Sequence, residues 1–81
     1  MSGDYLRHSP ATDYVVCHSL RISRDGTTFS IHALIQRRDN LGRVTDMGDA
    51  THRLLSGLTF EQANRIVMRA QQSIFIPVAD L

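Results

Sequence analysis

Apolar and polar residues alternate along two segments near the start of the chain, Tyr14–Ile22 and Thr28–Gln36. Such alternation is typical of β-strands that bury one face. The dipeptide Asp25-Gly26 lies between the segments and accepts the positive φ angles of a tight type I′ hairpin turn. The two segments are therefore predicted to pair as an antiparallel hairpin.

This turn also predicts a register. With Asp25-Gly26 as a two-residue loop, Ile22 faces Phe29, and the pairs further out bring the apolar residues to one face. Those outer pairs are Leu20 with Ile31, His18 with Ala33, and Val16 with Ile35. The other face would be a mixed surface suited to solvent or a partner, formed by Val15, Cys17, Ser19, Arg21, Ser30, His32, Leu34 and Gln36.

The pattern is less regular after a second turn at Asp39–Gly42. A third strand is predicted over at least Arg43–Met47, and Gly48-Asp49 should form a bulge or a break. Ala50–Leu55 is then either the continuation of this strand or a separate short piece.

A helix is predicted from Thr59, an N-cap residue, because Gln62 lies three positions later and completes a capping box. Glu61 and Arg65 are spaced for an i,i+4 ion pair. The apolar stripe that would pack on the sheet consists of Phe60, Ala63, Ile66, Val67 and Ala70.

Together these elements predict an α+β fold in which one helix packs on one face of a three-stranded antiparallel sheet. Ile74–Val78 could add a short fourth strand at an edge, where Pro77 is tolerated. Residues 13–81 should form a single domain. Residues 1–12 contain Gly3 and Pro10 with little hydrophobic content, which indicates a flexible N-terminal arm.

The length of 81 residues leaves little room for an enclosed pocket, so surface binding is favoured over enclosed chemistry. A homodimer would enlarge the small core. The formal net charge of +1 argues against a protein held to nucleic acid by bulk charge. With one cysteine and no long apolar run, the chain is expected to be cytoplasmic, without a membrane segment.

Candidate chemistry is sparse. Cys17 and His18 are adjacent and would point to opposite faces of a strand, so they are poorly placed to bind one metal ion. No serine lies in a nucleophile-elbow pattern. We therefore expect no catalytic residues, no metal site and no cofactor.

Basic residues form two candidate contact regions. Arg37, Arg38 and Arg43 bracket the second turn and could grip phosphates or an acidic protein surface. The alternative is solvated charge at a hairpin tip, partly neutralised by Asp39. On the predicted helix, three residues outside the core stripe form a second contact region: Arg65, Met68 and Arg69.

Three strands followed by a helix that begins Leu58-Thr59-Phe60-Glu61-Gln62-Ala63 resemble the small DNA-binding domains of the AP2 and tyrosine-integrase arm-binding type. That resemblance implies a sheet laid in the major groove of DNA. The sheet-face residues that would make such contacts are Arg21, His32, Leu34 and Gln36.

In its small size, its composition and its lack of a catalytic pattern, the chain also resembles the inhibitor proteins of phages and mobile elements, anti-CRISPR proteins among them. This resemblance implies a non-catalytic protein that binds a host protein or nucleoprotein complex. A small DNA-binding accessory domain that uses the sheet face and the Arg37, Arg38 and Arg43 tip is the alternative hypothesis.

Overall fold

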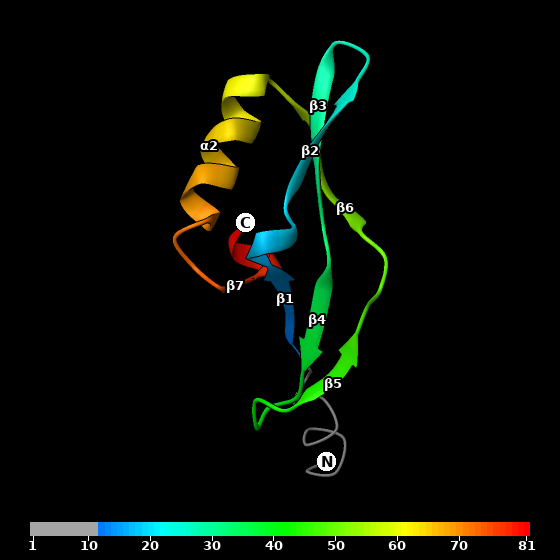
Figure 1. The fold of residues 1–81 in the computed structure, drawn as a ribbon, viewed down its shortest axis with the longest axis vertical. Helices are drawn as coiled ribbons and strands as arrows, with labels where there is room; N and C mark the ends of the chain where they lie inside the picture. The colour runs from blue at the N-terminus through cyan, green and yellow to red at the C-terminus, as the bar shows by residue number, and fades with distance from the viewer. Residues whose placement is uncertain (1–11) are drawn as a thin grey trace, which may run out of the picture.

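The computed structural model describes residues 12–81, in which seven strands form two antiparallel sheets beside one α-helix (Figure 1). The α+β class is confirmed, but the strands outnumber the three or four predicted. The elements are β1 (Thr12–Val16), η1 (Cys17–Ser19), β2 (Arg21–Asp25), β3 (Thr28–Ala33), β4 (Ile35–Arg38), β5 (Val44–Met47), β6 (His52–Leu58), α2 (Phe60–Ala70), β7 (Phe75–Pro77) and η2 (Val78–Asp80).

The two sheets follow one another along the length of the molecule (Figure 1). One has the strand order β2-β3-β6, and α2 contacts all three of its strands. This part corresponds to the predicted three strands with a helix on one face. The other sheet has the order β5-β4-β1-β7, and sequence analysis did not predict it as a separate sheet.

Each of the two long predicted strands is divided. The 3₁₀ turn η1 separates β1 from β2, and Leu34 separates β3 from β4. The Ser19 hydroxyl joins the two interruptions, because it donates to the carbonyl of Val16 (2.6 Å) and accepts from the N–H of Leu34 (2.8 Å). The side chain thus adds to the backbone hydrogen bond that joins the two interruptions, from the N–H of Val16 to the carbonyl of Leu34 (3.0 Å).

The hairpin forms as predicted, but its register was wrong. The loop residues are Gly26 and Thr27, so Ile22 pairs with Ile31 instead of Phe29. Only Gly26 has a positive φ (65°) there, which fits a type II′ turn and not a type I′ turn. Because side chains alternate with a period of two, this two-residue shift keeps Ile22 on the apolar face.

In β1, on the other side of η1 from the hairpin, the predicted buried and exposed faces of the strand are exchanged. Val15, and not Val16, pairs with Ile35. The turn at Cys17–Ser19 breaks the alternation of sides, so His18, predicted on the core face, is exposed. Conversely, several residues of the predicted outward face are buried: Val15, Cys17, Ser19, Ser30 and Gln36.

The predicted third strand is two strands in different sheets. β5 pairs with β4, whereas β6 pairs with β3, so the second segment is a separate piece and longer than predicted. Gly48 lies at the break, and its N–H donates to the carbonyl of Ile35 (3.2 Å).

The start of the predicted helix is confirmed, and so is most of its buried face. Phe60, also predicted on that face, is instead 54% exposed, with its ring centre 5.4 Å from that of Phe29. The Thr59 hydroxyl accepts from the N–H of Gln62 (3.1 Å), and the Gln62 side chain accepts from the N–H of Thr59 (2.9 Å). Ala63 and Ala70 are buried on the sheet, with Ile66 and Val67 half-buried beside them.

The C-terminal segment forms the predicted edge strand, because β7 pairs with β1 and contains Pro77. The predicted arm covers residues 1–12; residues 1–11 lie outside the described residues, and Thr12 is the first residue of β1. Among residues 12–81, no helix combines the length and the apolar character needed to cross a membrane.

Candidate functional site

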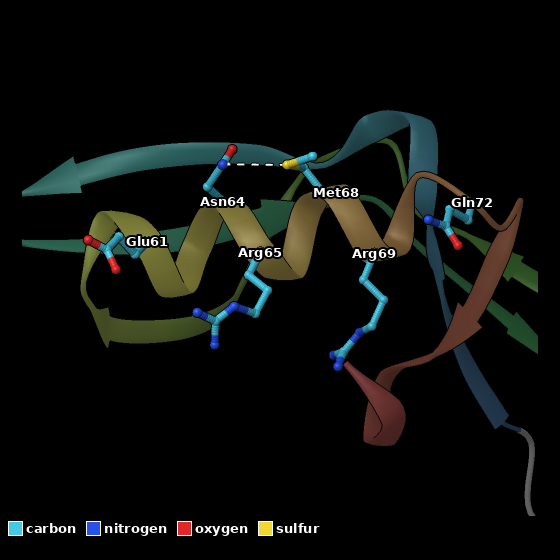
Figure 2. Close-up of a pocket in the computed structure, with 6 residues that line it drawn as sticks. All are labelled: Glu61, Asn64, Arg65, Met68, Arg69 and Gln72. Atoms are coloured by element: carbon cyan, nitrogen blue, oxygen red, sulfur yellow. Dashed lines mark hydrogen bonds between the residues drawn. The ribbon is translucent and has the colours of Figure 1, made fainter.

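The outward face of α2 carries an open hollow of about 520 Å³. Figure 2 shows the residues that line it. Met68 lies at this hollow with 59% of its surface exposed, and the Asn64 side-chain amide donates to its sulfur (3.5 Å). Arg65 and Arg69 extend from the other side of the helix face (Figure 2). The predicted contact residues Arg65, Met68 and Arg69 are thus brought together.

Arg65 and Arg69 form no ion pair within the part of the chain that the structure describes. Glu61, spaced for a pair with Arg65, instead extends toward the start of the helix (Figure 2). The hollow therefore presents two guanidinium groups that have no acidic partner among residues 12–81, next to an exposed thioether. Such a surface can accept carboxylates around one apolar side chain.

The three arginines predicted at the second turn are engaged within the protein. The Arg37 guanidinium donates to both carboxylate oxygens of Asp13, at 2.8 and 3.3 Å. These hydrogen bonds lower the pKa of Asp13 from its usual range. Arg37 and Arg38 are successive residues of β4, so their side chains leave the strand on opposite faces.

Arg38 lies over two aromatic rings, with its guanidinium carbon 4.4 Å from the centre of the Phe75 ring and 5.2 Å from that of Tyr14. Its Nε donates to the side-chain carbonyl of Gln36 (2.6 Å). Cation–π contacts and this hydrogen bond hold the side chain against sheet β5-β4-β1-β7.

Arg43 pairs with Asp39 across the turn, at 3.2 Å from Nε to Oδ2. The N–H groups of Arg43 and Leu41 also donate to the Asp39 carboxylate, and these contacts lower its pKa, the one from Arg43 most. The Arg43 charge at this hairpin tip is thus paired with Asp39, whereas the Arg38 guanidinium contacts aromatic rings and an amide oxygen.

The predicted sheet-face residues are only partly available. Arg21 is exposed and pairs across the strands with the half-buried His32. Leu34 is half-buried at the strand break, and Gln36 is 4% exposed. Sequence analysis missed Arg53, which pairs with His32 from β6 and extends the row to three strands. No sequence pattern predicts this placement, because two irregularities in the pairing of β3 with β6 set the register.

Within residues 12–81, no group of three histidine, cysteine or acidic side chains is placed to hold a metal ion. Cys17 is buried, and burial raises the pKa of its thiol. The thiolate form is therefore disfavoured at this position.

Comparisons of the chain with protein families, with curated proteins and with solved structures found no match.

Proposed function

We propose that this protein is a non-catalytic binding protein that attaches to a protein partner through the outward face of α2. The observation that carries the proposal is the pair Arg65 and Arg69, which have no ion pair within the described residues and flank the exposed Met68. The three predicted arginines of the second turn are instead engaged by Asp13, by Asp39 or by aromatic rings.

The chemistry of this face favours an acidic protein surface that offers an apolar contact for Met68. Arginine forks bind carboxylates through two parallel hydrogen bonds. An unbranched thioether adapts to an irregular apolar contact. The helix itself is capped and packed on the sheet, so binding would not have to order it first.

As to biological role, we propose an inhibitor of the kind that phages and mobile elements direct at host complexes, as anti-CRISPR proteins are. The placement of two guanidinium groups on an open surface, with no acidic partner among the described residues, supports this role. Such an inhibitor works by occupying a surface of its target, which requires complementarity and no catalytic residues.

The test begins with capture of the tagged protein from a lysate of its native host, with and without nuclease. A stoichiometric protein that persists after nuclease treatment is then purified and its affinity for variants is measured. Arg65→Glu/Arg69→Glu should weaken binding at least tenfold, because both charges are reversed at the contact. Arg24→Glu, an exposed arginine at the tip of the β2–β3 hairpin, is the control. Equal loss for both variants would count against the α2 face.

A second candidate function is nucleic-acid binding by the outer face of sheet β2-β3-β6. The observation that favours it is the row of Arg21, His32 and Arg53 across the three strands. In that case the captured material would be nuclease-sensitive, and affinity for duplex DNA would fall steeply with salt concentration.

A further inference from the structure

Three charged residues stand side by side across sheet β5-β4-β1-β7. Asp13 of β1 pairs with Arg37 of β4, and Arg37 pairs with Asp46 of β5. Both hydrogen bonds of the Arg37 fork go to Asp13. Asp46 therefore ends the row with no ion pair of its own among the described residues, and it lies on the outermost strand.

Within the described residues 12–81, β5 is an edge strand that has β4 as its one neighbour. All four of its residues are exposed. Because the Gly48 N–H bonds to the carbonyl of Ile35, and Met47 is paired with Gln36 one step along, the N–H and C=O of Met47 point away from β4. These groups can accept the ladder hydrogen bonds of another strand.

The other sheet edges carry features that discourage pairing. β7 contains Pro77, β2 has charged residues along its length, and β6 is irregular with Gly57 at a φ of 69°. Proline, charge and irregularity are common means of blocking an edge. β5 lacks proline and carries two exposed apolar side chains, Val44 and Met47.

A bulge opposite Arg37 and Arg38 places these apolar side chains on a common face. Val44 pairs with Arg38 and Met47 with Gln36, two residues that share one side of β4, while Asp46 is on the side of Arg37. Along β5, the apolar side chains of Val44 and Met47 thus lie on one face of the sheet, and the acidic side chain of Asp46 lies on the other.

We infer that β5 binds an extended segment of a protein partner as an added strand, with a basic residue opposite Asp46 between two apolar residues. Asp46 would occupy a non-hydrogen-bonded position, where facing side chains approach most closely. An opposite charge there continues the row from Asp13 through Arg37 to Asp46. A second copy fits less well, because Arg43, the basic residue next to β5, is already paired with Asp39.

The inference rests on the proposed function only in that both require a protein partner, since β5 and the face of α2 are separate surfaces.

The probe is the peptide acetyl-Thr-Thr-Val-Arg-Val-Thr-Thr-amide, titrated into the ¹⁵N-labelled full chain. Amide shifts should be largest at residues 44–48. The same peptide with Glu in place of Arg should bind more weakly, and Asp46→Asn should lower the affinity for the Arg peptide about two- to fivefold.

Substitutions in β5 distinguish the contribution of backbone pairing to peptide binding from that of charge. Met47→Pro removes the outward N–H and should abolish binding, whereas Met47→Leu should retain it. Asp46→Arg should reverse the preference in favour of the Glu peptide, and this holds even if the proline variant fails to fold. Arg65→Glu/Arg69→Glu should leave peptide binding unchanged, so failure of the α2 proposal is distinguishable.

Equal affinity for the Arg and Glu peptides, or shifts centred outside residues 44–48, would overturn the inference. So would concentration-dependent dimerisation in analytical ultracentrifugation that Met47→Pro abolishes, because β5 would then bind a second copy.

Discussion

The Ser19 side chain forms hydrogen bonds at the place where both long predicted strands are interrupted. It is 8% exposed, and its hydroxyl is the hydrogen-bond acceptor for the N–H of Leu34, a residue outside any strand. Without that hydroxyl, the partly buried N–H would lose its partner. One side chain thereby links two segments fifteen residues apart in the chain.

Ser19→Ala is therefore expected to lower the free energy of unfolding by about 1–3 kcal/mol, the usual cost of leaving a buried donor unsatisfied. Urea unfolding followed by circular dichroism measures this change. Ser23→Ala, at an exposed position of β2, should change stability by less than about 0.5 kcal/mol. Equal effects of the two substitutions would show that the Ser19 bridge contributes little.

Sequence could not reveal the role of Ser19, because the hydroxyl acts through Leu34, a residue far along the chain. The alternation from Tyr14 to Ile22 passes through Cys17–Ser19 without any glycine or proline to mark a turn. Once the chain turns there, the sides exchange, which explains why His18 is exposed and Val15 is buried.

At the scale of elements, the capping box gives α2 a start determined by two residues. Thr59→Ala removes the hydroxyl that accepts from the Gln62 N–H and should cost about 1 kcal/mol of stability. Thr59→Ser keeps that acceptor and should lie close to the wild type. Thermal and urea unfolding of the two variants provide the comparison, and equal loss in both would argue against the cap.

Elements with short-range signals were predicted well. The start of α2 depends on residues three apart, and the edge strand β7 follows from a short apolar run containing Pro77. Pairing that depends on distant segments was not predictable, because β5 and β6 are consecutive in sequence yet join different sheets. The hairpin register failed by two residues for a local reason, since Gly26 occupies the first loop position and not the second.

At the scale of the whole molecule, the same limits apply to the candidate site. Arg65, Met68 and Arg69 share one helix face, so their spacing alone brought them together. Arg37, Arg38 and Arg43 are also near in sequence, but Asp13 and Phe75 engage two of them from distant strands. The row through Arg53 and the row ending at Asp46 both required the observed strand pairing.

Acid should destabilise the molecule through the carboxylates that these arginines engage. Hydrogen bonds from Arg37 lower the pKa of Asp13, and those from the backbone of Arg43 lower that of Asp39. A carboxylate whose pKa is lowered by folding stabilises the folded state above its unfolded pKa. That contribution is lost as the pH falls through the folded-state pKa.

The free energy of unfolding should therefore decline as the pH drops below the ordinary aspartate range, and more gently in an Asp13→Asn/Asp39→Asn variant. Urea titrations across the acid range would measure both profiles, with the exposed Asp49→Asn as the control. Added salt should reduce the difference, because both carboxylates are near the surface, where counterions screen the pairs. Parallel acid profiles for the double variant and the wild type would show that these two carboxylates do not set the acid limit of the fold.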